Sequence, residues 1–451
     1  MAYARSMEPS YPEPGAAAAW AAPAADRPVR AQLSLPGSKS MTNRALVLAA
    51  LADAPSTITG PLKARDTVLM SAALTALGAT IGSTSDPDAA AWRVAPGRPA
   101  ADTSVDVGNA GTVMRFVPPV AALTGVAVRF HGDDRASQRP VGPLLAALRE
   151  LGAVIDDAGA GAVPFTVRGS GSVAGGAVTL DASASSQLVS GLLLAAPRYD
   201  KGIEVRHRGP RAPSAPHIGM TVQMLRQAGA DVETASRAPG GLPDTWRVHP
   251  GTLPGRDFTV EPDLSNAAPF LAAALVTGGS VTIAGWPAVT AQPASQILGL
   301  LTRMGASSEL TADGLRLTGT GTIHGVSADL ADVSELVPVA AALAALADSP
   351  SRLTGIGHMR RHETDRLAAL ATEINALGGD VAELPDGLAI RPRPLRAGER
   401  PFASYDDHRL VMAAAVLGLA VPGIEVANAA TVGKTFPAFT QLWASMLERG
   451  P

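Results

Sequence analysis

The chain has 451 residues, of which 46% are hydrophobic and 4% aromatic, so we expect two or three domains with cores of Ala, Val and Leu. Its formal net charge of −3 gives no electrostatic case for binding nucleic acid or an acidic membrane surface. The absence of cysteine excludes disulfides, thiolate metal ligands and a thiol nucleophile. Every apolar run of about 18 residues is interrupted by a charge, Gly or Pro, so we expect no membrane span.

The first 28 residues are rich in Ala and Pro, and Trp20 interrupts their longest apolar run, Ala16–Ala22. They lack the basic start and continuous apolar core of a secretory signal. We expect residues 1–28 to form a disordered tail and the protein to be cytoplasmic.

The stretch Leu35–Leu51, LPGSKSMTNRALVLAAL, predicts a glycine turn followed by a buried helix. Lys39, Ser40 and Arg44 fall on the turn and the first helical steps, and Ser40 and Arg44 share a face because they are four residues apart. A helix N-terminus favours anions, so the added cations predict an oxyanion or phosphate site. The alternative is an ordinary capped helix with surface charges.

Six copies of one unit follow, with a period of about 70 residues. Each reads as an Ala/Leu-rich helix, a strand, an amphipathic helix such as Glu363–Leu377, and a two-stranded hairpin, with hairpin turns at Asp313-Gly314 and Asp386-Gly387. Because the Ala/Leu-rich helices are apolar all round, we expect helices inside and sheets outside. Landmarks of those helices are Leu46, Val120, Leu192, Ala272, Ala340 and Ala414.

Six units divide as three plus three, with a midpoint near Pro250–Pro262. The strand Val29–Leu35 lacks a partner in the first unit, so we expect it to cross to the C-terminal domain. The expected domains are 37–261 and 29–36 plus 262–451, with the ligand site in the cleft between them. The alternative is a protein-binding solenoid, although solenoid repeats usually have about 20–50 residues.

Polar residues of the N-terminal half cluster in loops before helices. GNAGT, with Gly111, frees backbone N–H groups for an anion, although a simple capped turn is equally consistent. The other loops supply a cation and neutral donors suited to phosphate oxygens and hydroxyls: Arg139, Ser185, Ser186, Gln187 and Ser214.

The C-terminal half supplies carboxylates and more cations. Glu335 begins a buried helix, where it is either functional or a cap. Glu363 is three residues before Arg366, so on a helix the two are neighbours, and they are either functional or only an ion pair. Arg409 follows Asp-His in DDHRLVM, and Lys434 lies in VGKTFP, which is not a Walker A loop. So many cations in one cleft would repel one another unless anionic ligands filled it.

The motifs LPGSKSMTNRA, GNAGT-MR, RP-G, SSQ, HETDRL, DHR-VM and KTFP occur in this order from about Val29 onward. Together they resemble the 5-enolpyruvylshikimate-3-phosphate synthase (3-phosphoshikimate 1-carboxyvinyltransferase) family. The resemblance implies an α/β fold, a two-domain inside-out α/β barrel in which each domain has three βαβαββ repeats and the active site lies in the interdomain cleft. It implies transfer of the enolpyruvyl group of phosphoenolpyruvate to the 5-hydroxyl of shikimate 3-phosphate, in the shikimate pathway of aromatic amino-acid biosynthesis. No metal or cofactor, nucleic acid or membrane is implied, and we expect a monomer.

The resemblance also implies the roles of individual residues. Glu335 would be the base for the 5-hydroxyl, Glu363 and Lys39 are the candidate proton donors to C3 of phosphoenolpyruvate, and Asp66 would organise the site. The shikimate 3-phosphate contacts would be Lys39, Ser40, Arg44, Ser185, Ser186, Gln187, Ser214, Glu335 and His362. The phosphoenolpyruvate contacts would be Lys39, Gly111, Arg139, Gln187, Arg366, Arg409 and Lys434.

The chain departs from the family pattern at four positions. His362 replaces the usual Lys and would make binding pH-sensitive, Glu335 replaces a frequent Asp, His217 replaces Tyr in some members, and Phe116 replaces a frequent Pro. We expect glyphosate to compete with phosphoenolpyruvate, because Gly111 leaves room beside that site. A related family acting on UDP-N-acetylglucosamine is the closest rival, but its usual reactive Cys is absent and its opening resembles GAKN rather than GSKS.

Overall fold

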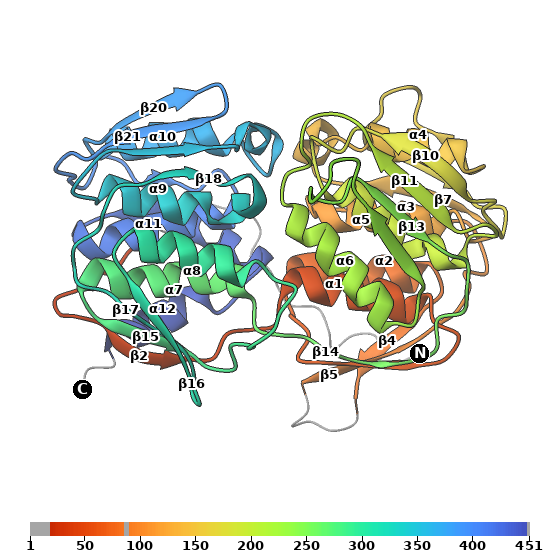
Figure 1. Ribbon diagram of the computed structural model, residues 1–451, viewed down its shortest axis with the longest axis horizontal. Helices are drawn as coiled ribbons and strands as arrows, with labels where there is room; N and C mark the ends of the chain where they lie inside the picture. Colours follow the sequence, from red (N-terminus) through yellow and green to blue (C-terminus); the bar gives the residue numbers. More distant parts are fainter. Residues whose placement is uncertain (1–18, 85–89, 449–451) are drawn as a thin grey trace.

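The computed structural model describes residues 19–84 and 90–448. Two lobes of similar build lie side by side, one from each half of the chain (Figure 1). The N-terminal lobe contains α1 (Lys39–Ala50), β3 (Ser56–Thr59), α2 (Arg65–Ala76), β4 (Thr80–Ser83), β5 (Ala91–Ala95), β6 (Thr103–Asp106), α3 (Gly111–Ala121), β7 (Ala127–His131), α4 (Gly142–Glu150), β8 (Val154–Asp156), β9 (Phe165–Arg168), β10 (Gly176–Leu180), α5 (Gln187–Ala195), β11 (Ile203–His207), α6 (Ala215–Gln227), β12 (Val232–Ala235), β13 (Thr245–Val248) and β14 (Asp257–Thr259).

The C-terminal lobe is built from the rest of the chain and two N-terminal strands. Its elements are β1 (Trp20–Ala21), β2 (Arg30–Leu33), α7 (Leu264–Thr277), β15 (Ser280–Ile283), α8 (Ala294–Arg303), β16 (Ser307–Thr311), β17 (Gly314–Thr318), β18 (Ser327–Asp329), α9 (Val337–Ala345), β19 (Ser351–Thr354), α10 (Arg366–Ala376), β20 (Asp380–Leu384), β21 (Gly387–Arg391), β22 (Phe402–Ala403), α11 (His408–Ala420), β23 (Glu425–Ala427) and α12 (Phe439–Glu448).

Each unit forms a small mixed sheet of one pattern. In the order β18-β19-β21-β20 the first pair is parallel and the other pairs are antiparallel, and four more sheets follow the same order. The helices α1, α3 and α5 of one lobe and α7, α9 and α11 of the other are buried along most of their length, and every residue of α3 and α9 is buried. The expected arrangement of helices inside and sheets outside is confirmed, because helices this rich in Ala and Leu have no polar face to expose.

The lobes exchange their leading strands. β2, which precedes α1, pairs in parallel with β15, and β14, which precedes α7, pairs in parallel with β3. The first pairing agrees with the crossing predicted for Val29–Leu35. The two crossing segments meet at a bridge between Gly37 and Pro262, where a Cβ on Gly37 would lie 2.0 Å from the carbonyl oxygen of Gly60. Only glycine fits this close approach of two backbones.

The prediction of a disordered tail is wrong for residues 19–28, which contain β1. β1 pairs antiparallel with β23, in the position that β21 takes beside β19, and so completes the sixth sheet. Ala22 is buried, and its N–H donates to the carbonyl of Ile424 at 2.9 Å. The amide of Ala25 donates to Leu419 in the same way. Residues 1–18 lie outside the described residues.

The helix expected at Glu363–Leu377 begins later, at Arg366. The reason is local: the carboxylate of Asp365 accepts from the amide of Ala368 and caps α10, so Glu363 remains in the preceding loop. Both Asp-Gly hairpins form as predicted, between β16 and β17 and between β20 and β21. Within the described ranges, no helix combines the length and the apolar character needed to cross a membrane.

Candidate active site

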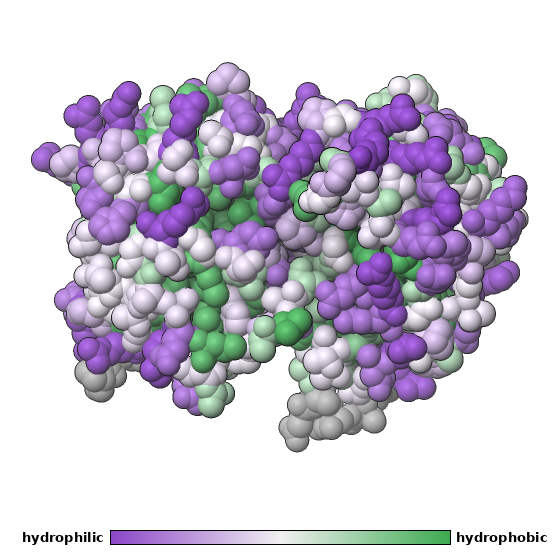
Figure 2. Space-filling model, viewed as in Figure 1, coloured by the Kyte–Doolittle hydropathy of each residue, from purple (hydrophilic) through white to green (hydrophobic). Residues whose placement is uncertain are grey.

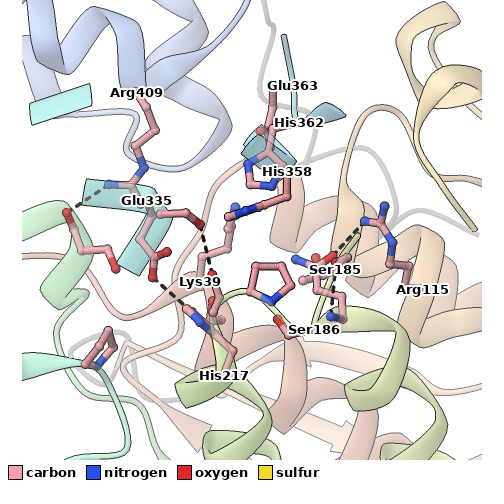
Figure 3. Close-up of a pocket in the computed structure, with 18 of the residues that line it drawn as sticks. Lys39, Arg115, Ser185, Ser186, His217, Glu335, His358, His362, Glu363 and Arg409 are labelled. Atoms are coloured by element: carbon pink, nitrogen blue, oxygen red, sulfur yellow. Dashed lines mark hydrogen bonds and ion pairs between the residues drawn. The ribbon is translucent and has the colours of Figure 1, made fainter. Parts of the chain in front are cut away.

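A cavity of about 130 Å³ lies where the two lobes meet, and side chains from both lobes line it (Figure 3). Thirteen residues expected to act in the site line this cavity: Lys39, Ser40, Arg44, Arg139, Ser185, Ser186, Gln187, Ser214, Glu335, His362, Glu363, Arg366 and Arg409. Gly111 and Lys434 are not among its lining residues. Lys434 lies directly behind Glu363, at 3.4 Å, and Gly111 lies behind Arg139.

The start of α1 is fixed by caps and by charge. The hydroxyl of Ser38 accepts from the amide of Met41 and caps the helix. The backbone N–H of Lys39 donates to Asp263 of the other lobe at 3.1 Å, and its ammonium group donates to Asp66 at 3.2 Å. Asp66 is buried, and its second oxygen has no hydrogen-bond partner within the described chain. Lys39 is therefore the side chain with which the carboxylate of Asp66 pairs.

Arg44 is almost wholly buried one turn further along α1. Its guanidinium donates to Thr221 at 2.7 Å, to the carbonyl of Ser40 at 2.9 Å and to the carbonyl of His217 at 3.0 Å, and it lies over the ring of Phe116. Burial lowers the pKa of Arg44 to about 9. Arg44 and Ser40 both line the cavity, which agrees with the helix face that their spacing predicts them to share.

The start of α3 is packed tightly against two arginines. Arg139 donates to the carbonyl and the side chain of Asn109, and Arg115 donates to Gln187 at 3.0 Å. A Cβ on Gly111 would lie 2.7 Å from Arg139 Nη2, 2.8 Å from Arg115 Nη1 and 2.9 Å from Gln187 Oε1. The glycine therefore allows these side chains to converge beside the helix N-terminus, where anions are favoured.

Glu363 lies among three cations. Its oxygens are 2.9 Å from Arg366, 3.4 Å from Lys434 and 3.8 Å from Arg139, which belongs to the other lobe. Burial by itself would raise the pKa of this carboxyl, but Lys434, Arg366 and Arg139 outweigh burial and hold the pKa well below its usual value. Glu363 is therefore a carboxylate in this arrangement.

Arg366 is held in turn by Asp407, which is fully buried. The carboxylate of Asp407 accepts from Arg366 Nε at 2.6 Å and Nη2 at 3.1 Å, and also from the backbone N–H of Arg409. Burial disfavours the charged form of Arg366, but Asp407 and Glu363 raise its pKa above the ordinary value. Arg409 itself donates to the carbonyl of Ser265 at 3.0 Å.

Three histidines line the same cavity as Glu335. His217, from the N-terminal lobe, lies 3.6 Å from Glu335, and the rings of His358 and His362 are in edge-to-face contact at 5.3 Å (Figure 3). Burial lowers the pKa of all three, that of His358 to about 4 and that of His362 well below its usual value, with Arg366 adding to the effect at His362. All three are therefore neutral near pH 7 as arranged here.

Further contacts join the lobes around the cavity. Arg135 donates to the carbonyl of His362 at 3.3 Å, and Lys434 donates to the carbonyl of Asn109 at 3.2 Å. The amide of Ser214, a residue with a left-handed backbone (φ 51°), donates to the carbonyl of Ala331 at 2.7 Å. The lobes touch along the upper part of the seam and separate below it (Figure 2). These contacts explain why the cavity is smaller than the roughly 300–1,000 Å³ usual for ligand sites.

Sequence reasoning missed some of the residues that line the cavity. Arg115, His358, Asp263 and Gln292 all do so, yet none had been assigned a role. Arg115 falls inside the motif GNAGT-MR, four residues after Gly111, so helical spacing offered a signal for it, whereas His358 lies four residues before the motif HETDRL. Asp263 caps α7 through the amide of Asn266 and also accepts from the backbone N–H of Lys39, and Gln292 donates to Glu261. The long-range contacts place both residues at the cavity, and no local pattern marks that placement. Among the described residues, no group of three or more His, Asp or Glu side chains is arranged to hold a metal ion.

The model of one family, EPSP synthase (3-phosphoshikimate 1-carboxyvinyltransferase), matches residues 23–443. The chain belongs to the EPSP synthase family. A 3-phosphoshikimate 1-carboxyvinyltransferase of Mycobacterium ulcerans (strain Agy99) is 52% identical over 435 residues, which cover 95% of this chain and 98% of the relative.

Solved structures support the fold assignment for this EPSP synthase family member. An EPSP synthase from Acinetobacter baumannii is similar with a TM-score of 0.76 at 24% identity, covering 95% of this chain and 98% of that one. The enolpyruvyl transferase NikO from Streptomyces tendae is similar with a TM-score of 0.71 at 18% identity, covering 94% of this chain and 96% of that one. At these identities the likeness concerns the fold alone. The α/β two-domain architecture predicted from the motifs and repeats is confirmed.

Proposed function

We propose that this EPSP synthase family member is a 3-phosphoshikimate 1-carboxyvinyltransferase, which transfers the enolpyruvyl group of phosphoenolpyruvate to the 5-hydroxyl of shikimate 3-phosphate and releases phosphate. The carrying observation is the convergence of Lys39 and Arg139 from one lobe with Arg366 and Arg409 from the other on one cavity that also contains carboxylates. Two substrates that each bear a phosphate and a carboxylate would match this charge.

Shikimate 3-phosphate is proposed to bind mainly to the N-terminal lobe and phosphoenolpyruvate between the lobes. The hydroxyls of Ser185, Ser186 and Ser214 are neutral donors suited to phosphate oxygens, and Lys39, Ser40, Arg44, Gln187, Glu335 and His362 complete the proposed contacts for shikimate 3-phosphate. The proposed contacts for phosphoenolpyruvate are Lys39, Gly111, Arg139, Gln187, Arg366, Arg409 and Lys434. The planar guanidinium groups among them suit bidentate binding of carboxylate or phosphate.

Glu335 is the proposed general base. One of its oxygens is buried without a hydrogen-bond partner in the described chain, and it faces the cavity opposite Lys39 (Figure 3). It would accept the proton of the 5-hydroxyl as that oxygen attacks C2 of phosphoenolpyruvate. In the same step C3 gains a proton, and a tetrahedral intermediate forms that the surrounding cations stabilise.

Glu363 is the proposed proton donor to C3, with Lys39 as the alternative. Its pKa is held low by Lys434, Arg366 and Arg139 against the effect of burial, so it is a poor acid as arranged here. The phosphate and carboxylate of phosphoenolpyruvate would take over those cations, and the pKa of Glu363 would rise because burial then dominates. The same group would take the proton back when phosphate leaves and the enol double bond re-forms.

We also propose that each lobe is a domain, with boundaries at 37–261 and at 29–36 plus 262–451, and that the exchange of β2 and β14 forms the hinge. The protein is proposed to be a cytoplasmic monomer inhibited by glyphosate. A biosynthetic enzyme with small, water-soluble substrates and two self-contained cores fits this description.

The test is phosphate release with both substrates present. Wild type should release phosphate only when both are added, and Lys39→Ala and Glu335→Ala should lose most of the rate. Matched controls are Lys201→Ala and Glu233→Ala, which are exposed on the N-terminal lobe and should retain the wild-type rate. Calorimetry should show shikimate 3-phosphate binding alone and improving the affinity for phosphoenolpyruvate. Absence of phosphate release from the wild type would overturn the proposal.

A further inference from the structure

A buried carboxylate outside the cavity has an unusual number of partners. Glu373, on α10, is 1% exposed. Its two oxygens accept from both terminal nitrogens of Arg400, at 2.8 and 2.9 Å, from the backbone N–H of Ala403 at 3.1 Å and from the hydroxyl of Tyr405 at 2.7 Å. Two of these four contacts hold the segment 402–407, which links β22 to α11, rather than the helix on which Glu373 lies.

The segment 402–407 is strained. Tyr405 and Asp406 both have left-handed backbones, with φ of 51° and 54°, which side chains other than glycine rarely adopt. Such a conformation persists only where surrounding contacts over-determine it, and it clusters at functional sites. Here the contacts are Tyr405 with Glu373, the side chain of Asp406 with Asn428 at 2.5 Å, and the hydroxyl of Ser404 with the carbonyl of Asn428.

The same segment joins the three elements that carry the cations of the C-terminal lobe. Arg366 begins α10, two turns before Glu373. Asp407 ends the strained segment, binds Arg366 with both oxygens and caps α11 just before Arg409. Asn428 immediately precedes the short 3-10 helix Ala429–Lys434, whose last residue is the third cation.

We propose that Glu373 and Tyr405 are positioning residues for the subsite that binds phosphoenolpyruvate: they hold the segment 402–407 so that Arg366, Arg409 and Lys434 keep their spacing. This inference rests on the proposed function, because it assigns those three cations to phosphoenolpyruvate. Neither residue lines the cavity, so both act through Asp407 and through Asn428. Within the described chain, no hydrogen bond or ion pair joins this segment to the N-terminal-lobe residues proposed for shikimate 3-phosphate, so the effect should be specific to one substrate.

The test uses mild variants in the full-length enzyme. Tyr405→Phe removes one oxygen from a side chain that is 41% exposed, and Asn428→Gly removes the amide while keeping a residue that tolerates the left-handed backbone (φ 48°). The matched control is Tyr199→Phe in the other lobe, where the hydroxyl is buried without a hydrogen-bond partner in the described chain. Phosphate release is measured with each substrate varied in turn, alongside calorimetry with shikimate 3-phosphate alone and a urea unfolding curve.

Tyr405→Phe and Asn428→Gly should each raise KM for phosphoenolpyruvate roughly three- to tenfold, as expected for a lost hydrogen bond to a charged group or a strained loop. KM and affinity for shikimate 3-phosphate should stay within about twofold of wild type, and Tyr199→Phe should change neither. Equal changes in both KM values, or a lower unfolding midpoint with unchanged KM for phosphoenolpyruvate, would overturn the inference and leave a structural role. A wild type without phosphate release would instead overturn the proposed function, so the two failures are distinguishable.

Discussion

Arg139 Nη2 of the N-terminal lobe lies 3.8 Å from Glu363 Oε1 of the C-terminal lobe, and both side chains are at least nine-tenths buried. The carboxylate of Glu363 is therefore paired with the same cations that would bind phosphoenolpyruvate in the proposed subsite. An anionic ligand must compete with Glu363 for Arg139, Arg366 and Lys434, and in doing so it changes the protonation of that carboxyl. Under the proposed roles, binding of phosphoenolpyruvate and proton donation would be linked through this one side chain.

Glu363→Gln tests this link. The amide keeps the shape of the side chain but cannot donate and recover a proton, so kcat should fall by about 10²- to 10⁴-fold. The affinity for phosphoenolpyruvate should not fall, because a competing anion is removed. Steady-state kinetics and calorimetry measure the two effects. Glu383→Gln, a partly exposed glutamate of the same lobe that pairs with Arg360, is the matched control. A Glu363→Gln enzyme with wild-type kcat would assign proton donation to another group, such as Lys39.

Gly111→Ala tests the room beside the phosphoenolpyruvate subsite. The added methyl group would lie 2.7–2.9 Å from the ends of Arg139, Arg115 and Gln187, which are side chains and can shift. The fold should therefore persist while KM for phosphoenolpyruvate rises by roughly tenfold and glyphosate inhibits less, since a subsite distorted by about 1 Å loses binding. Gly299→Ala on α8, where an added Cβ meets no atom within 4 Å, is the control. Equal glyphosate sensitivity of the Gly111→Ala and wild-type enzymes would refute the prediction.

The histidines of the cavity predict a pH dependence of stability. Burial lowers the pKa of His217, His358 and His362 in the folded protein, that of His358 to about 4, whereas the unfolded chain titrates near its ordinary value of about 6.5. Between these values the unfolded state binds more protons, so the free energy of unfolding decreases as pH falls below about 6.5. The stability that the neutral histidines contribute is fully present above that pH. The carboxylate of Glu363 adds a further loss of stability only when the pH falls near and below the usual pKa of a glutamate.

Urea unfolding at pH 7.5, 6.5 and 5.5 without substrates measures this effect. His358→Asn should lose less stability than wild type between the two ends of this range, because one of the proton-linked groups is gone. His324→Asn, at an exposed site on the C-terminal lobe, should behave as wild type. A stability independent of pH over this range would contradict the prediction.

Completion of the sixth sheet by β1 predicts a role for the N-terminal segment in stability. A chain that begins at residue 27 lacks the strand Trp20–Ala21 and the buried Ala22, and leaves one edge of β23 unpaired. Its free energy of unfolding should be lower by about 1–3 kcal/mol, while kcat is kept because β1 lies at the outer edge of this sheet and none of residues 20–22 lines the cavity. Chemical unfolding measures the difference against a chain that begins at residue 19. Equal stability of the two chains would mean that β1 contributes nothing.

Local patterns in the sequence were enough to identify the repeating unit, the buried helices and the helix starts that carry polar residues. Runs of Ala and Leu bury a helix on every face, Asp-Gly pairs turn a hairpin, and Ser38 and Asp365 cap helices through their nearest neighbours, so these features depend on residues close in the chain. The order of the motifs was also enough to identify the family, which the comparisons confirm. The roles of the individual site residues remain predictions.

Only the tertiary structure decided what happens between segments distant in the chain. The pairing of β1 with β23 escaped prediction because two residues in an Ala/Pro-rich stretch have no strand signal of their own. They become a strand because the edge of β23 offers backbone groups with which they can pair. The charge of Glu363 is likewise set by Arg139 and Lys434, which approach it from distant parts of the chain. Electrostatic interactions depend on distance and burial, and for these residues both quantities are set by the packing of the lobes and not by spacing in the sequence.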